Sequence, residues 1–300
     1  MTPQDPSPRQ TLSYLRGLFE AHGIQPKNKL GQNFLIDLNL LDLVLRSAEL
    51  SREDLVLEVG SGTGSLTARL AEQAGAVLSV EIDEDFFALA SEAVAGREHV
   101  VLLHTDILKN KNLLDPQVLT TLATLQQRYQ SRKLKLVANL PYAVATPVIA
   151  NLLLSELTFE RMVVMVQAEI AERLLALSGT KEYGALAVLV QSLANVEAVR
   201  RRVPPSVFWP RPQVDSAMVR IIPDPAKRAH VGDVACFRNF LRDLYTHRRK
   251  NLRGALAALP SGRRSKEEVD ALLGQLGLDG TIRAEELDPE QHLRLCKVFG

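Results

Sequence analysis

A glycine-rich segment early in the chain has the composition of a ligand-binding loop. It runs from Glu58 to Gly64 with the pattern G-x-G-x-G, between an apolar run and a helical pattern. Glycines let the backbone turn tightly and approach a ligand, and the helix that follows offers free N–H groups to an anionic group. The dinucleotide fingerprint requires a third glycine where this chain has Ser65. The loop alone therefore fits either a nucleotide-like ligand or a tight turn between strand and helix.

Acidic residues follow the next two predicted strands. Glu81 ends the strand after the glycine loop, where a carboxylate can accept both hydroxyls of a ribose, and Asp106 follows the strand after that. The carboxyl ends of parallel strands share one edge of a sheet, and ligands of open α/β folds bind at that edge. Acids at strand ends also cap turns, but three such features in succession favour a ligand. They do not separate a nicotinamide cofactor from S-adenosyl-L-methionine.

A tetrapeptide after the fourth predicted strand suits a planar ring that carries an exocyclic amine. It reads Asn139-Leu140-Pro141-Tyr142. The Asn139 oxygen and a backbone carbonyl can accept N–H bonds, which draws the nitrogen toward a tetrahedral shape with a free lone pair. Tyr142 can hold the ring by stacking, as extruded bases are commonly held. The alternative interpretation is a proline turn with a half-buried tyrosine.

The elements that position these residues alternate between strands and helices. Predicted strands span 54–59, 76–82, 99–103, 134–138, 161–166, 195–202 and 215–222. Predicted helices span 10–22, 38–48, 84–95, 116–130, 168–177 and 184–194, with another that follows the glycine loop and one that has Pro147 at its first position and ends at 154. This alternation predicts βα units and a mostly parallel sheet covered by helices on both faces.

Composition limits the class of protein. The 300 residues are 46% hydrophobic and carry 36 basic against 35 acidic side chains, which excludes a disordered or fibrous chain. The sequence shows neither an apolar run long enough for a membrane span nor a signal peptide, so we expect a cytoplasmic protein. Cys236 and Cys296 cannot form a zinc site alone, and we expect free thiols and no metal.

Three segments organise the chain. We predict an N-terminal tail and helix at 1–23, a ligand-binding domain at 24–224 and a helical domain at 225–300. The proline-containing segment near 224 is the expected boundary. In the last segment, we expect glycines to divide the helical pattern into short pieces: Gly254, Gly274 and Gly277.

Six motifs occur in an order typical of one family. They are Gly31–Leu35, Leu57–Thr67, Val80–Asp83, Asp106, Asn139–Tyr142 and Phe208–Ser216. Over about residues 24–253 the chain resembles the adenine-N6 dimethyltransferases of small-subunit ribosomal RNA, the kasugamycin-sensitivity type. The resemblance implies a class I methyltransferase fold, with a Rossmann-like, mostly parallel sheet of seven strands and a small helical C-terminal domain. It also implies transfer of four methyl groups from S-adenosyl-L-methionine to two adjacent adenosines near the 3′ end of the RNA.

The resemblance also implies residue roles. It assigns the cofactor site to Asn33, Leu35, Gly60, Gly62, Glu81, Asp106 and Asn139, with Glu81 at the ribose and Asp106 at the adenine ring. It assigns catalysis to Asn139, Leu140, Pro141, Tyr142 and Phe208, with Phe208 facing Tyr142 across the target base. Ordinary core packing is the alternative for Phe208 and Trp209.

The chain departs from the family pattern in three places. Ser61 stands where the family usually has proline, and Ala143-Val144 stands where it usually has Asn-Ile. Ser61 is more typical of the related large-subunit enzymes of macrolide resistance, whereas Gly31–Asn33 and Leu140 favour the small-subunit branch. The segment 109–133 is longer than usual, and its role is open.

Basic side chains cluster locally although the net charge is only +1. One run, Arg200–Arg202, precedes the aromatic loop that holds Arg211, and a second cluster comprises Arg242, His247, Arg248, Arg249, Lys250 and Arg253. Lys27 and Lys29 are candidates for the rim of the site. Such clusters suit RNA phosphates, although many are only solvated faces. We expect a monomer that acts on small-subunit ribosomal RNA or a precursor of the small subunit, without membrane contact.

Three other functions stay open. A nicotinamide oxidoreductase is disfavoured by Ser65 and by the lack of a placed catalytic histidine or Tyr–Lys pair. A large-subunit RNA methyltransferase shares the motifs. A non-catalytic RNA-binding assembly factor could keep the fold, but the intact Glu81, Asp106 and Asn139–Tyr142 argue for catalysis.

Overall fold

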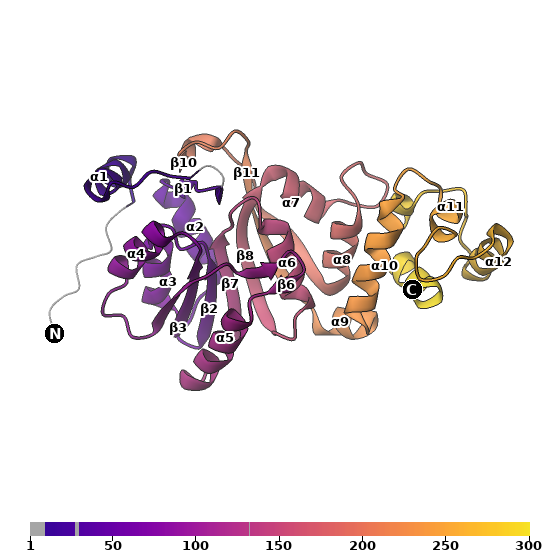
Figure 1. The fold of residues 1–300 in the computed structure, drawn as a ribbon, viewed down its shortest axis with the longest axis horizontal. Coiled ribbons are helices and arrows are strands. Elements are labelled where there is room, and N and C mark those ends of the chain that lie inside the picture. The colour runs from indigo at the N-terminus through magenta and orange to yellow at the C-terminus, as the bar shows by residue number, and fades with distance from the viewer. Residues whose placement is uncertain (1–9, 28–29, 132) are drawn as a thin grey trace. The chain divides into compact units, whose positions relative to one another are not determined.

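A computed structural model describes residues 10–27, 30–131 and 133–300 (Figure 1). The predicted tail and Lys29 lie outside these residues. The chain forms two compact units: unit 1 contains the chain up to Ala171 and Glu197–Ile222, and unit 2 contains Glu172–Val196 and Pro223–Gly300. The chain therefore passes between the units three times, and the boundary expected near 224 corresponds to the last of these passages. Residues 172–196 cluster with the helical unit instead of the sheet.

Unit 1 is built on a seven-stranded sheet with the order β4-β3-β2-β7-β8-β11-β9. The strands are β2 (Asp54–Val59), β3 (Ala76–Glu81), β4 (Val100–His104), β7 (Lys133–Asn139), β8 (Phe159–Gln167), β9 (Ala194–Val203) and β11 (Ser216–Pro223). The pairs from β4 to β8 are parallel, whereas β11 runs antiparallel to β8. The prediction of a mostly parallel, seven-stranded sheet is confirmed.

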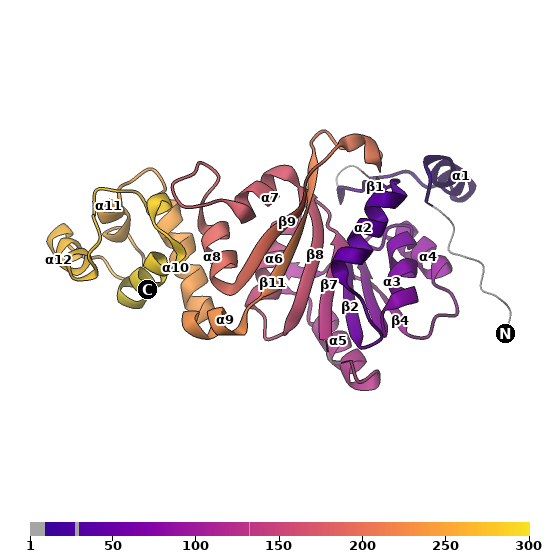
Figure 2. The same ribbon diagram turned by 180° about the vertical axis from the view of Figure 1, so that it is seen from behind.

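Helices cover both faces of this sheet (Figures 1 and 2). The helices of unit 1 are α1 (Leu12–His22), α2 (Leu38–Ala48), α3 (Ser65–Gln73), α4 (Glu84–Ala93), α5 (Pro116–Arg128) and α6 (Ala145–Leu154), and α7 (Ala168–Leu175) crosses the unit boundary. On one face, α2 and α3 pack on alternate strand residues such as Val56, Val77 and Val137. Because a strand presents successive side chains to opposite faces, Leu55 and Leu57 face the other layer.

Short elements complete unit 1 and differ from the prediction. The two-residue strands β1 (Phe34–Leu35) and β10 (Phe208–Trp209) pair antiparallel, and the hairpin β5 (Leu108–Asn110)–β6 (Leu113–Leu114) precedes α5. Neither pair has a hydrophobic pattern long enough to reveal it. α6 begins at Ala145, so Pro147 lies at its third residue and not at its first.

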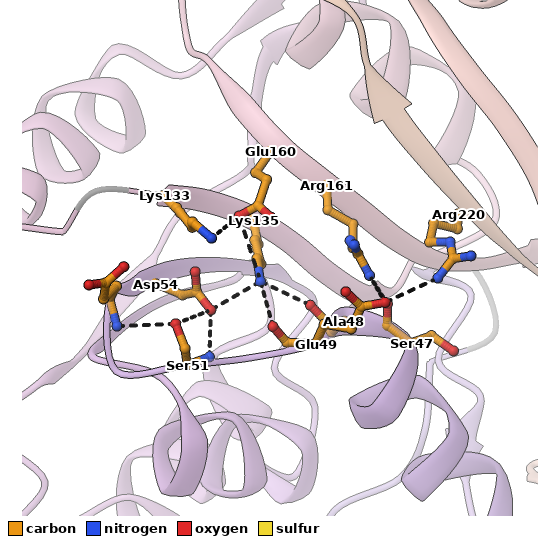
Figure 3. A network of polar contacts seen from close by, with 11 residues as sticks. Ser47, Ala48, Glu49, Ser51, Asp54, Lys133, Lys135, Glu160, Arg161 and Arg220 are labelled. Carbon is orange, nitrogen blue, oxygen red and sulfur yellow. Dashed lines mark hydrogen bonds and ion pairs between the residues drawn. The ribbon is translucent and has the colours of Figure 1, made fainter.

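An ion-pair network joins the C-terminal end of α2 to the sheet (Figure 3). Lys135 of β7 is 2% exposed, and its ammonium lies 3.1 Å from Asp54 and donates to the carbonyls of Ala48 and Glu49 at 3.2 and 2.7 Å. Arg161 of β8 donates to the Ser47 carbonyl at 3.0 Å. Cations are favourable at a helix C-terminus, where carbonyls lack partners within the helix. The network therefore anchors α2, whose other end adjoins β1.

Unit 2 is helical. It contains α8 (Ala185–Leu193), α9 (Pro225–Val231), α10 (Val234–Thr246), α11 (Leu252–Leu256), α12 (Lys266–Leu276) and α13 (Pro289–Phe299). Gly277 ends α12 in the left-handed conformation, as expected, but Gly254 and Gly274 lie within α11 and α12. The expectation that these two divide the helices is wrong. Among the described residues, no helix is long and apolar enough to cross a membrane.

Candidate active site

A cavity of about 250 Å³ lies in unit 1 at the carboxyl edge of the parallel strands. Its lining includes every residue that the sequence predicts for the cofactor: Asn33, Leu35, Gly60, Gly62, Glu81, Asp106 and Asn139. These residues come from β1 and from the ends of β2, β3, β4 and β7. The structure therefore brings together groups that are up to 106 positions apart in the chain. No group of three or more His, Cys, Asp or Glu side chains in the described ranges could hold a metal ion.

The glycine loop has the backbone conformation that its composition requires. Gly60, Gly62 and Gly64 have φ angles of 84°, 54° and 77°, a region that other residues rarely adopt. A Cβ on Gly62 would approach the Phe34 ring to 3.0 Å, and one on Gly64 would lie 2.9 Å from the α carbon of Ala90. These glycines let the loop lie between β1 and α4 and present its backbone to the cavity.

Glu81 is oriented by the backbone around it. Its Oε2 accepts from the Gly62 N–H at 2.9 Å, and its Oε1 accepts from the N–H groups of Ile82 and Asp83 at 3.0 Å each. Burial raises its pKa, and these three hydrogen bonds oppose that shift. The carboxylate is therefore held in one orientation at the edge of the cavity. Asp106 is exposed, and its Oδ1 accepts from the Leu108 N–H at 2.9 Å.

Glu58, a buried acid below the glycine loop, was not among the site residues predicted from the sequence. Glu58 is 1% exposed and lines the cavity, and its Oε2 accepts from the hydroxyls of Thr67 and Ser79 at 2.6 Å each. The Ser79 hydroxyl is also hydrogen-bonded to that of Ser61 at 2.6 Å. Among the described residues, Glu58 Oε1 has no partner. Burial raises the pKa of Glu58 to about 8, so the acid is neutral below that pH.

We expect Glu58→Gln to remove a pH dependence of stability. The folded chain keeps the Glu58 proton up to pH about 8, whereas the unfolded chain loses it near pH 4.5. Between these values the folded state binds more protons, so its stability falls as the pH rises, by up to about 1.4 kcal/mol per unit. Urea unfolding followed by the fluorescence of Trp209, the single tryptophan, reports on unit 1. In Glu58→Gln the free energy of unfolding should change less between pH 5 and 8 than in the wild type. If the two proteins show the same change of unfolding free energy with pH, the raised pKa of Glu58 is contradicted.

Asn139 ends β7 with its amide in a defined orientation. Its Nδ2 donates to the Asn33 carbonyl at 3.0 Å, and because that carbonyl can only accept, the nitrogen must be the atom that faces it. No hydrogen bond within the described residues uses Asn139 Oδ1. The side chain thus presents a fixed acceptor at the cavity. The Asn33 amide itself donates to the Gly31 carbonyl at 3.0 Å, which stabilises the turn before β1.

The rest of the tetrapeptide adjoins this acceptor. Pro141 lines the cavity, and its ring lies within 3.4 Å of a Cβ built on Gly60. Leu140 is buried, and its N–H donates to the Met165 carbonyl at 3.1 Å. The Tyr142 hydroxyl is hydrogen-bonded to Ser216 at 2.7 Å, and burial raises the pKa of Tyr142, so its phenol stays neutral.

Phe208 is buried in unit 1. Its side chain is 1% exposed and packs in the core with Leu40, Val44 and Met218. The β1–β10 pairing places it opposite Leu35 in register, so its ring contributes to the layer between the sheet and α2. Phe208 is thus packed as a core residue here, which is the alternative interpretation, and its place opposite Tyr142 across a base stays a prediction. Trp209 likewise packs with Phe19, at 5.3 Å between ring centroids.

Gln10, which the sequence analysis missed, and Lys27 attach the N-terminal segment to unit 1. Gln10 lines the cavity, donates to the Leu35 carbonyl at 2.7 Å and accepts from the Thr63 hydroxyl in the glycine loop. Lys27 lies 2.8 Å from Asp83 and 3.1 Å from Asp85. Lys27 is therefore occupied by an ion-pair cluster and is not a free cation at the rim. A single glutamine outside the motifs carries no sequence signal for such a role.

Comparisons with known proteins agree with this geometry. The family model described as ribosomal RNA adenine dimethylase matches residues 23–299. This chain belongs to that family. A relative named ribosomal RNA small subunit methyltransferase A from Levilactobacillus brevis is 36% identical, over 99% of this chain and 96% of its own.

Two solved structures resemble this ribosomal RNA adenine dimethylase at 25% identity. A dimethyladenosine transferase from Plasmodium falciparum has a TM-score of 0.70 and matches 87% of this chain and 95% of its own. The 23S rRNA methyltransferase ErmE has a TM-score of 0.61 and matches 89% of this chain and 99% of its own.

Members of the ribosomal RNA adenine dimethylase family use S-adenosyl-L-methionine as the methyl donor, and the cavity of this member fits that cofactor. The fit rests on three features of the chain: glycines that leave backbone exposed, the carboxylates of Glu81 and Asp106, and the buried Glu58 Oε1 without a partner. A buried polar atom without a hydrogen bond costs stability unless a bound group satisfies it. Because Glu58 lines the cavity, a molecule bound there is the group that would satisfy Oε1.

The predicted basic clusters of this dimethylase are partly used in the fold. Arg248 lies 2.7 Å from Glu285 and donates to the Lys181 carbonyl at 2.6 Å, and Arg253 lies 2.5 Å from Asp270. Arg242 is paired with Asp243, and Arg202 is paired with Asp215. Within these clusters, the exposed arginines and lysines without an ion pair among the described residues are Arg249, Lys250, Arg200, Arg201 and Arg211. These five are the better candidates for RNA contact.

Proposed function

We propose that this protein transfers methyl groups from S-adenosyl-L-methionine to N6 of two adjacent adenosines near the 3′ end of small-subunit ribosomal RNA. The observation that carries the proposal is the Asn139 amide, whose nitrogen is bound to Asn33 and whose oxygen is left as an acceptor at the cavity. A small-subunit target is supported by 36% identity to the small-subunit relative, against 25% to the large-subunit enzyme. The substrate of such a reaction lies in the cytoplasm of a bacterial cell.

When bound, S-adenosyl-L-methionine supplies an electrophilic methyl group on a sulfonium. We propose that Glu81 accepts hydrogen bonds from the ribose hydroxyls and that Asp106 binds the adenine ring. Gly60, Gly62, Asn33 and Leu35 shape the walls around the cofactor. Glu58 Oε1 adds a polar group in the same cavity, one that the six motifs do not single out.

The tetrapeptide acts on the target base. Asn139 Oδ1 and the Leu140 carbonyl accept hydrogen bonds from the two N6–H groups of the adenine. These hydrogen bonds turn the nitrogen lone pair toward the methyl group. Pro141 fixes the backbone between them, and Tyr142, held by Ser216 at 2.7 Å, stacks on the ring. The nitrogen loses its proton to water after transfer, so no side chain is required as a base.

We expect Glu81→Ala to weaken binding of S-adenosyl-L-methionine by about 1–3 kcal/mol, because hydrogen-bonding groups then lose their partner. Isothermal titration calorimetry measures this change. Glu84→Ala removes an exposed carboxylate three residues later and should leave the affinity unchanged. Tight binding of NAD with no binding of S-adenosyl-L-methionine would reject the cofactor assignment altogether.

Methyl transfer from labelled S-adenosyl-L-methionine to separately purified, unmethylated small and large ribosomal subunits tests the proposal. We expect label only on the small subunit. Label on the large subunit would instead support the macrolide-resistance type of activity. Binding to small subunits without any transfer would support the non-catalytic assembly factor.

A further inference from the structure

A groove of about 310 Å³ in unit 1 lies between α2 and the end of β9. Leu40, Leu43 and Val203 contribute apolar side chains to it, and two arginines, Arg46 and Arg200, also line it. Both arginines are exposed. Arg46 belongs to no motif or basic run, so the sequence does not associate it with Arg200, which is 154 positions away.

Contacts at both ends of the groove show that β9 runs antiparallel along α2. At the N-terminal end of α2, the Ile36 N–H donates to the Val207 carbonyl at 2.9 Å. At the other end, Arg220 binds both Glu49, just after α2, and Glu197 of β9. Arg200 therefore lies toward the C-terminal end of α2, the end that carries Arg46.

The acids near this end of the groove are already neutralised. Glu49 is 2.5 Å from Arg161 and 3.5 Å from Arg220 (Figure 3), and its hydrogen bond with Arg161 lowers its pKa. Glu197 is paired with Arg220. Asp37 also lines the groove, but it caps α2 by accepting from the Leu40 N–H at 3.0 Å, and nine residues of helix separate it from Arg46 by about 13 Å.

The two arginines, in contrast, keep their charges uncompensated. Neither Arg46 nor Arg200 forms an ion pair within the part of the chain that the structure describes, and Arg200 uses only its Nε, which donates to the Arg202 carbonyl at 3.4 Å. The two guanidinium groups and the apolar side chains of Leu40, Leu43 and Val203, called the apolar floor below, therefore form a concave, positively charged site. Guanidinium groups match the geometry of a phosphate, to which each can donate two parallel hydrogen bonds.

We propose that this groove binds a backbone phosphodiester of the RNA substrate, with Arg46 and Arg200 on the phosphate oxygens and the apolar floor under the adjoining sugar. The inference rests on the proposed function for the identity of the substrate. On α2, Leu40 lines the groove and the next residue, Leu41, lines the cofactor cavity. Since a helix with its side chains is about 10 Å wide, the bound phosphate would be only a few nucleotides from the target adenosine.

The test uses the full chain, unmethylated small ribosomal subunits and three variants: Arg46→Gln, Arg200→Gln and the double variant. The dissociation constant is measured between about 50 and 200 mM KCl. Each lost phosphate contact should reduce the slope of log affinity against log salt by about 0.7–0.9. Arg69→Gln is the matched control, because this arginine of unit 1 already binds Asp42 at 2.8 Å and Glu72 at 3.5 Å.

Catalytic measurements distinguish a phosphate contact from a structural effect. The double variant should raise KM for the subunits while kcat and the affinity for S-adenosyl-L-methionine stay at the wild-type values. A salt slope equal to that of the wild type, or a loss of cofactor affinity in parallel, would overturn the groove proposal. If the wild-type protein itself transfers no methyl groups to small subunits, the proposed function fails instead, and the salt slopes still report on the groove.

Discussion

Replacement of Asn139 by alanine should lower the rate of methyl transfer about 10²- to 10³-fold, the loss typical of one well-placed polar contact in a transition state. The Asn139 oxygen is the acceptor left over when the amide nitrogen binds Asn33. In the proposed mechanism, its hydrogen bond to the target nitrogen strengthens as that nitrogen becomes tetrahedral, so it stabilises the transition state more than the bound substrate. Single-turnover transfer to unmethylated small subunits measures the effect on the chemical step.

Two companion variants separate this role from folding and from base capture. Asn151→Ala removes an asparagine of α6 that donates only to the Lys111 carbonyl, and we expect near-normal turnover. Tyr142→Ala should also weaken capture of the base, because stacking contributes roughly 1–3 kcal/mol. RNA affinity and melting temperature should change little in Asn139→Ala. Near-normal turnover in this variant, or its unfolding, would exclude the proposed role of Asn139.

Replacement of Lys135 by methionine should destabilise unit 1 by about 3–5 kcal/mol, because it leaves a buried carboxylate without its cation. Asp54 is 0% exposed, its Oδ1 already lacks a hydrogen-bond partner among the described residues, and its Oδ2 accepts from Ser51. The substitution also leaves the carbonyls of Ala48 and Glu49 without the Lys135 donor. Urea unfolding followed by Trp209 fluorescence measures the free energy of unfolding of this unit.

Lys133 provides a matched control two residues earlier on the same strand. Its side chain is 46% exposed, and its ammonium lies 3.6 Å from Glu160. An exposed pair of this kind contributes about 0–1 kcal/mol, so Lys133→Met should change stability little. The double variant Asp54→Asn with Lys135→Met should recover part of the loss. Equal effects of Lys133→Met and Lys135→Met would contradict a stabilising role of the buried pair.

The cofactor cavity could be predicted because its residues follow one topological rule. Each βα unit of a parallel sheet places its loop at the carboxyl edge, so the acids after β3 and β4 and the tetrapeptide after β7 had to meet there. Glu58 carried a usable signal as well, since it opens the glycine loop. Its burial, however, depends on the Ser79 and Thr67 partners from β3 and α3, which no local pattern specifies.

The residues whose contacts sequence analysis did not predict depend on pairings between distant segments. Phe208 is buried because a two-residue strand pairs with Leu35, and such a short pairing leaves no periodic signal. Gln10 joins the cavity through one hydrogen bond to each of two loops. Arg248 is held by Glu285 and by a carbonyl of the 172–196 segment, which the sequence assigns to the other domain. Among the described residues, the segment 109–133 forms part of the β5–β6 hairpin, α5 and the start of β7.

Nucleoside analysis of the product RNA tests the central proposal most directly. Unmethylated small subunits are incubated with the protein and S-adenosyl-L-methionine, their RNA is digested to nucleosides, and the modified nucleosides are identified by mass spectrometry. The proposed function predicts two N6,N6-dimethyladenosines per small subunit, both in one fragment near the 3′ end of the RNA, and almost none with Asn139→Ala. Methyl groups on another base, on a ribose or only on large-subunit RNA would contradict it.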